Sequence, residues 1–254
     1  MKIRTTSNIE LKQFFEKGFQ VFPEILDIKH VEYLKNNILK IKKKQNKNFS
    51  EEELSSIGEE NTIRSPFLYD DSFRFVFYNN FCKKLARHIL GDFAILSLQN
   101  CIFIPGNQSH HQSFYHRDLI YQNFVSSVPL SINLYCCLTD YYEENGGTSF
   151  ALGSHKKHSF SNLDKTEIPT VKAGSYILFN SMTFHKAGTN KTKFPRIGIN
   201  NMYTLPFIKQ QINYPNVIKR ETNDEDLNQL LGFKSREFPS VEEFRNYRLK
   251  RIKK

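Results

Sequence analysis

The spacing of hydrophobic residues changes near residue 93, and this change divides the chain into segments of different character. Before it, apolar residues recur every three or four positions, which is typical of amphipathic helices. From residue 93 to Pro206, short apolar or alternating runs rich in β-branched and aromatic residues predict strands. We therefore expect one domain over residues 1–254, with helical support in 1–92, a β core in 93–206 and a C-terminal helical extension in 207–254.

The first segment predicts helices around one short strand. The expected elements in order are a helix from Ile9 to Gly18, a strand over 19–22, a helix over 31–41 capped by Asp27, a polar and mobile connection over 42–64 with one or two helical turns, and one or two helices over 73–91.

The β core contains six candidate strands separated by turn sequences, with no crossover helices between them. These strands are 93–104, 112–118, 129–138, 148–152, 170–179 and 195–205. Without crossover helices the strands cannot form a doubly wound parallel sheet. The pattern instead favours antiparallel sheets in a sandwich, a barrel or a jelly roll.

The two faces of these strands differ in polarity, because side chains alternate along a strand. In 129–138 one face is apolar and the other contains Ser131, Asn133, Tyr135 and Cys137. The last strand has Ile197, Ile199 and Tyr203 on one face and Arg196, Gly198, Asn200 and Met202 on the other. Ser97 and Gln99 form a polar pair on one face of the first strand. This phasing favours a mainly β jelly roll whose outer face is covered by the N-terminal helices and whose mouth holds a polar site.

The net charge of +10 reflects 36 basic and 26 acidic residues. Much of the excess lies in residues 40–47 and 245–254, where a solvated helix face or a tail explains it. Neither cluster has the interleaved aromatic residues of a single-strand binder, so a nucleic-acid partner is disfavoured. A small-molecule substrate that carries an acidic group stays open.

Cysteine usage and hydropathy indicate a soluble cytoplasmic protein. The four cysteines lack the Cys-x-x-Cys spacing, and Cys136 and Cys137 lie in an apolar strand, which is typical of reduced core residues. The N-terminus has no secretory apolar segment, and no run of 18 apolar residues predicts a membrane span.

Candidate metal ligands lie at His116 and Asp118, whose side chains would point to the same side of a strand. A second histidine from a later strand would complete a two-histidine, one-carboxylate set, which leaves about three open positions on an octahedral iron(II). His185 lies before a turn sequence, and Arg196 follows eleven residues later. In a simple hairpin the two would lie roughly opposite each other, where the planar arginine could bind a carboxylate.

His116-Arg117-Asp118-Leu119, followed by Asn123, also matches the catalytic-loop string of protein kinases. A kinase further requires a glycine-rich phosphate loop and a strand lysine upstream, then Asp-Phe-Gly and Ala-Pro-Glu downstream. The chain has no such series in that order, so we disfavour this interpretation.

The chain resembles the phytanoyl-CoA dioxygenase family of iron(II)- and 2-oxoglutarate-dependent oxygenases over most of residues 8–206. The resemblance rests on His-x-Asp, the distal His and the following Arg, on the entry sequence 16–22, and on Glu144-Asn145-Gly146-Gly147-Thr148-Ser149-Phe150-Ala151-Leu152-Gly153-Ser154-His155. It implies a double-stranded β-helix, the cupin-like jelly roll, that uses Fe(II), 2-oxoglutarate and O2.

The resemblance also implies residue roles. His116, Asp118 and His185 would bind iron, and Arg196 would bind the distal carboxylate of 2-oxoglutarate. Strand phase makes Asn133 and Gln99 candidates to line the co-substrate or substrate site, and a structural hydrogen bond is the alternative role for each. Related halogenases have a small residue in place of Asp118, so its presence implies hydroxylation or another oxidation. The reaction that we expect is hydroxylation of a small molecule with conversion of 2-oxoglutarate to succinate and CO2. The family often has a small hydroxyl residue where this chain has Ala187, which puts one 2-oxoglutarate contact in doubt.

Two alternatives stay open. A jelly-roll protein that binds metal without turnover is one, although the intact ligand set and Arg196 argue against it. An oxygenase that acts on protein or nucleic acid is the other, for which the basic charge is suggestive.

Overall fold

The computed structural model describes residues 10–160 and 165–252. The expectations for Ile9, Lys253 and Lys254 lie outside the described residues. The helices are α1 (Lys12–Lys17), α2 (Ile28–Gln45), α3 (Glu51–Ser56), α4 (Arg74–Phe77), α5 (Asn80–Leu90), α6 (Tyr214–Ile218), α7 (Glu225–Leu230) and α8 (Val241–Ile252). The strands are β1 (Phe19–Phe22), β2 (Thr62–Arg64), β3 (Ile95–Ile104), β4 (Ser131–Cys137), β5 (Ser149–Ala151), β6 (Thr166–Glu167), β7 (Tyr176–Asn180), β8 (His185–Lys186) and β9 (Arg196–Thr204).

Two antiparallel sheets form the β core. The large sheet has the strand order β1-β7-β4-β9-β3-β2, and the small sheet has the order β6-β5-β8. Phe19 of the large sheet stacks on Phe150 of the small sheet, with ring centroids 4.6 Å apart, so the two sheets pack face to face. The predicted fold class is confirmed as a mainly β jelly roll with flanking helices, and its sheets do not close into a barrel.

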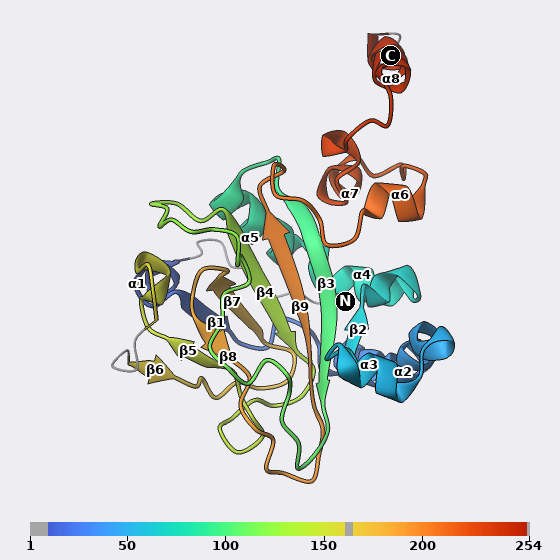
Figure 1. Ribbon diagram of the computed structural model, residues 1–254. Helices are drawn as coiled ribbons and strands as arrows, with labels where there is room; N and C mark the ends of the chain where they lie inside the picture. The colour runs from blue at the N-terminus through green and yellow to red at the C-terminus, as the bar shows by residue number, and fades with distance from the viewer. Residues whose placement is uncertain (1–9, 161–164, 253–254) are drawn as a thin grey trace.

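Helices α2, α4 and α5 cover the face of the large sheet that points away from the small sheet (Figure 1). Leu134 of β4 and Ile199 of β9 pack there in one hydrophobic core with Val31 and Leu34 of α2 and Leu85 of α5. All five side chains are fully buried. Because this apolar face is buried by helices, the polar face of β4 and β9 is left to line the space between the sheets.

The predicted cap of the second helix and the predicted stop of the first are confirmed, although α2 continues past residue 41 to Gln45. The Asp27 carboxylate accepts from the backbone N–H of His30 and caps α2. Helix α1 ends at Gly18, which has the left-handed φ of +93° that glycine tolerates best. Ser50 and Glu53 form a capping box at the start of α3, which is one of the helical turns expected within 42–64.

Three sequence-based assignments need correction. Residues 112–118 form no strand, because only His116 makes an isolated bridge there. The strand predicted over 170–179 begins only at Tyr176. The polar connection over 42–64 contains the edge strand β2, which extends the large sheet beside β3.

The C-terminal residues pack against the body through α7 and then leave it. Leu227 and Leu230 of α7 pack in the hydrophobic core between the helices and the large sheet, the helical core. Helix α8 projects away from the rest of the molecule (Figure 1). Within the part of the chain described here, no helix combines the length and apolar character needed to cross a bilayer.

Candidate active site

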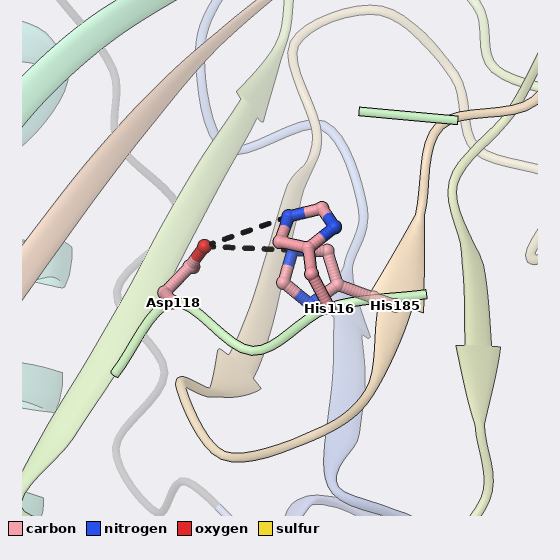
Figure 2. A group of neighbouring side chains, drawn as sticks. All are labelled: His116, Asp118 and His185. Carbon is pink, nitrogen blue, oxygen red and sulfur yellow. Dashed lines mark ion pairs between the residues drawn. The ribbon is translucent and has the colours of Figure 1, made fainter. Parts of the chain in front are cut away.

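The structure brings His116, Asp118 and His185 together from two separate segments. His116 lies in the loop between β3 and β4, and its backbone exchanges two hydrogen bonds of 3.0 Å with the backbone of His185 in β8. The Nε2 atoms of His116 and His185 lie 3.9 Å and 3.7 Å from Oδ1 of Asp118. Figure 2 shows both imidazoles facing this carboxylate. One potential ligand atom from each residue lies within 4.8 Å of the others, so the three could share one metal ion.

Backbone carbonyls determine which ring nitrogen of each histidine faces the carboxylate. His116 Nδ1 lies 3.0 Å from the carbonyl oxygen of Phe114, and His185 Nδ1 lies 2.9 Å from that of Thr183. A carbonyl can only accept, so Nδ1 carries the proton and Nε2 keeps its lone pair. Burial lowers the pKa of His185, which favours this neutral form even though Asp118 acts in the opposite direction.

The carboxylate is positioned through the backbone of its own residue. The Asp118 N–H donates to the Ser181 carbonyl at 3.0 Å. The Ser181 hydroxyl in turn accepts from Asn133 Nδ2 at 2.8 Å and pairs with the Ser131 hydroxyl at 2.7 Å. Side chains on the polar face of β4 therefore support the segment that holds Asp118.

Arg117, the residue between the two proposed ligands His116 and Asp118, anchors their loop to the neighbouring backbone. Its guanidinium group donates to the carbonyl oxygens of Met182 at 2.9 Å and Ser154 at 2.9 Å, and it lies 4.1 Å from the ring centroid of Phe184. The side chains of His116 and Asp118 can then face the same point although the segment is not a strand.

Arg196 is buried and has no acidic partner among the described residues. It begins β9 and is only 2% exposed. Its guanidinium carbon lies 4.6 Å from the ring centroid of Tyr141, and Nη1 lies 3.5 Å from Thr148 Oγ1. Among the described residues no carboxylate forms an ion pair with it, and its Nε has no hydrogen-bond partner. A buried cation of this kind is costly unless an anion compensates it, so the site is suited to an anionic ligand.

Two tyrosines and a threonine beside Arg196 were not singled out from the sequence. Tyr141 donates a 2.9 Å hydrogen bond to the hydroxyl of Tyr135, and Thr148 approaches Arg196. Burial raises the pKa of Tyr135 to about 12, so its phenol stays protonated. Tyr135 shares the polar face of β4 with Asn133, and Thr148 lies in the segment 144–155 that resembles the family. The sequence therefore contained a sign of a functional role at both positions.

Gly198 leaves the space that this tyrosine pair needs. A Cβ atom at this position would lie 2.2 Å from the Tyr141 hydroxyl and 2.3 Å from Cε1 of Tyr135. We expect Gly198→Ala to lower the free energy of unfolding by about 1–3 kcal/mol, because the rings over Arg196 must shift. Urea unfolding measures this change, and a variant as stable as the wild type would contradict the tight packing.

The triad and Arg196 line the same cavity between the sheets, which has a volume of about 280 Å³. Its apolar wall includes Phe150, Ile177 and Phe179. The ring centroids of Phe150 and Phe179 lie 6.0 Å and 4.8 Å from that of His185. Ala187 also lines it, at the position where the resembled family often has a hydroxyl residue.

The hairpin expected to join His185 and Arg196 is not formed. His185 lies in β8, which pairs with β5 in the small sheet, whereas Arg196 lies in β9 of the large sheet. The two residues thus reach the cavity from opposite walls.

The prediction for Gln99 needs correction. Its side chain donates to the Phe73 carbonyl at 3.0 Å and to Asn201 Oδ1 at 3.1 Å, and it accepts from Phe67 N–H at 3.1 Å. The residue is fully buried on the helical side of the sheet and is not among the residues that line the cavity. A β-bulge between Leu96 and Leu98 changes which residues face the cavity.

Asn133 lies on the cavity side of β4 but behind the lining residues. Its Oδ1 is buried and has no hydrogen-bond partner among the described residues. A direct contact between Asn133 and a bound molecule stays a prediction.

Comparison with known proteins extends over most of the chain. Residues 14–198 match the family model described as phytanoyl-CoA dioxygenase. The uncharacterized protein Rv1501 of Mycobacterium tuberculosis is 26% identical over 239 residues, which are 89% of this chain and 87% of that protein.

Two solved structures illustrate the similarity in fold. EctD from S. alaskensis, with 2-oxoglutarate and 5-hydroxyectoine, has a TM-score of 0.65 at 17% identity, over 81% of this chain and 80% of that chain. The non-heme alpha ketoglutarate dependent epimerase SnoN from nogalamycin biosynthesis has a TM-score of 0.58 at 19% identity, over 76% and 80% of the two chains.

Proposed function

The chain belongs to the phytanoyl-CoA dioxygenase family, and from this membership we propose that it is an iron(II)- and 2-oxoglutarate-dependent dioxygenase that hydroxylates a small molecule. The observation that carries the proposal is the convergence of two histidines and one aspartate on a cavity that also contains a buried arginine, for which the described part of the chain supplies no acidic partner. We further propose that all three segments of the chain form one oxygenase domain, since side chains from each of them share one core.

The triad fits an iron(II) ion. His116 Nε2 and Asp118 Oδ2 are buried and have no hydrogen-bond partner among the described residues. Both imidazoles present an Nε2 lone pair, and the carboxylate supplies one negative charge. Two histidines and a carboxylate on one side of a metal leave adjacent positions open for other ligands, which is typical of iron oxygenases.

Arg196 fits the distal carboxylate of 2-oxoglutarate. Its planar guanidinium group can donate two parallel hydrogen bonds to a carboxylate, and an anion there would compensate its buried charge. Thr148 Oγ1 lies 3.5 Å from Arg196 Nη1, and Tyr135 lines the same cavity, so both could bind the same carboxylate or orient the arginine. EctD, which has the same fold, was solved with 2-oxoglutarate.

When bound, iron, 2-oxoglutarate and O2 would supply the oxidising chemistry, in which one oxygen atom of O2 enters a C–H bond of the substrate and the other enters the succinate that forms, with CO2, from 2-oxoglutarate. The residues of the chain would hold and orient these groups. Phe150, Ile177 and Phe179 would exclude water from this end of the cavity, which strengthens the interactions of Arg196 and Asp118 with their ligands.

The cavity favours a small molecule over a macromolecular substrate. Its volume of about 280 Å³ lies near the lower end of small-molecule sites. The lysines of residues 40–47 lie in and just after α2, on the helical side of the large sheet (Figure 1), and none of them is among the residues that line the cavity. The basic cluster therefore does not mark a nucleic-acid path to the proposed metal.

The proposal is tested by succinate formation from 2-oxoglutarate, measured with and without added iron(II). We expect slow turnover without a second substrate and complete dependence on iron. A protein that binds iron and 2-oxoglutarate tightly but forms no succinate with any candidate substrate would instead support a non-catalytic binding protein. Because SnoN is an epimerase, product mass is needed as well, and hydroxylation requires the gain of one oxygen atom.

A further inference from the structure

The end of the cavity nearest β2 contains a row of polar side chains that the proposed iron and 2-oxoglutarate sites do not use. Strand register places Arg64 opposite Asn100 and Asn100 opposite Asn200. All three line the cavity. Residues directly opposite each other on neighbouring antiparallel strands share a face, so the row runs across β2, β3 and β9 toward Tyr135 of β4.

The charge of Arg64 is already compensated. Its Nε donates to Glu59 Oε2 at 2.8 Å, and its Nη2 donates to Glu59 Oε1. Its Nη1 donates to Gln211 Oε1 at 3.1 Å. Arg64 therefore differs from Arg196, which has no acidic partner among the described residues. An anion placed beside Arg64 would have to compete with the Glu59 carboxylate.

The remaining polar groups of the row are neutral and partly unsatisfied. Asn200 Oδ1 and Thr62 Oγ1 are buried and have no hydrogen-bond partner among the described residues. Thr62 is 4% exposed and also lines the cavity. A buried polar atom without a partner costs free energy, so a ligand that supplies hydrogen bonds at these points would be favoured. Carboxamides and hydroxyls can each donate and accept, as the hydroxyl groups of a ligand also do.

Apolar side chains lie beside the polar row, on the same face of β3 and β9. Leu98, Ile102 and Met202 line the same wall on β3 and β9. The wall thus offers hydrogen-bonding groups beside apolar surface, which matches a compact ring whose hydroxyls lie at its edge and whose C–H groups cover its faces.

We propose that this polar row is the substrate subsite of the enzyme and that it binds a neutral, hydroxyl-rich molecule in preference to an anion. The inference rests on the proposed oxygenase function, because it assigns the remaining part of the same cavity to the molecule that is oxidised. Asn100 and Asn200 are the specificity-determining residues, and Glu59 excludes anions by pairing with Arg64.

The test compares methyl β-glucoside with methyl β-glucuronide, which differ only in a hydroxymethyl group and a carboxylate. Dissociation constants are measured by saturation-transfer NMR on the full chain with zinc(II), which supports no turnover, and with saturating 2-oxoglutarate to occupy Arg196. We expect the glucoside to bind at least about fivefold more tightly, and Asn200→Leu to weaken glucoside binding by about fivefold or more. Asn216→Leu, an exposed position on α6, is the matched control and should leave binding unchanged.

Glu59→Gln supplies a gain of binding that a purely structural role would not produce. Removing this carboxylate frees the charge of Arg64, so the affinity for the glucuronide should rise by about tenfold while that for the glucoside changes little. Three results would each overturn the subsite. The wild type could bind the glucuronide as tightly as the glucoside or more tightly, Asn200→Leu and the control Asn216→Leu could change the dissociation constant of the glucoside equally, or the glucoside could fail to bind.

The same measurements in an Arg196→Leu background separate the two proposals. There, the glucoside preference tests the subsite without any 2-oxoglutarate. Calorimetric titration of the wild type with 2-oxoglutarate tests the oxygenase assignment on its own. If the glucoside preference is lost but 2-oxoglutarate still binds the wild type, the subsite proposal fails. If 2-oxoglutarate does not bind but the glucoside preference is kept, the oxygenase proposal fails.

Discussion

Asp118→Ala is expected to abolish iron-dependent succinate formation, with a loss of at least about a hundredfold. The substitution removes the only carboxylate of the triad and leaves two neutral imidazoles, which hold a divalent cation much more weakly. The fold should remain intact, because Asp118 is positioned by its backbone N–H bond to Ser181 and this bond survives. Succinate formation and iron binding by calorimetry measure the effect.

Thermal unfolding distinguishes loss of a ligand from loss of the fold. Iron that binds only the folded state raises the melting temperature of the wild type. The variant should lose this rise, while its melting temperature without iron should stay equal or increase, since Asp118 Oδ2 is a buried acceptor without a partner among the described residues. Asp92→Ala, whose side chain is 87% exposed, is the control. Iron-dependent turnover that persists in Asp118→Ala would reject the ligand assignment.

The strands that the sequence predicted well are those in which side-chain alternation is uninterrupted. In β9, Arg196, Asn200 and Met202 face the cavity and Ile199 faces the helices, as the pattern predicts. The register of β9 with its neighbours then preserves this alternation across the sheet.

The sequence pattern assigns side chains to the wrong face where a β-bulge interrupts a strand. Leu96 packs in the helical core, yet Leu98 lines the cavity, because the bulge between them inserts a residue. Gln99 consequently faces the helices. A bulge of this kind depends on pairing with β9, which periodicity within one strand does not contain.

The candidate ligands were recognised from the sequence although their predicted setting was wrong. His116 and Asp118 lie in a loop and not on a strand, and what aligns them is a backbone bridge to His185, far along the chain. Local pattern predicts the residue types that a metal needs. The pairing of distant segments, which decides that β8 and β9 belong to different sheets, is a property of the whole fold.

Arg196→Leu is expected to raise the concentration of 2-oxoglutarate needed for half-maximal turnover by about thirtyfold or more and to change the iron requirement little. Truncating one partner of a buried charge pair costs about 2–5 kcal/mol, and the lower value corresponds to about thirtyfold. Arg196 is not a member of the triad, so the three potential ligand atoms for iron are retained. Initial rates of succinate formation, with each of the two reactants varied in turn, measure both requirements.

Stability supplies an independent reading of the same arginine. Without 2-oxoglutarate, Arg196→Leu should unfold at an equal or higher temperature, because a buried guanidinium with no acidic partner among the described residues is replaced by an apolar side chain. With 2-oxoglutarate, the wild type should gain stability and the variant should gain much less. Arg220→Leu, an exposed position after α6, controls for removal of a charge. If the two variants respond alike to 2-oxoglutarate, the co-substrate carboxylate binds elsewhere in the cavity.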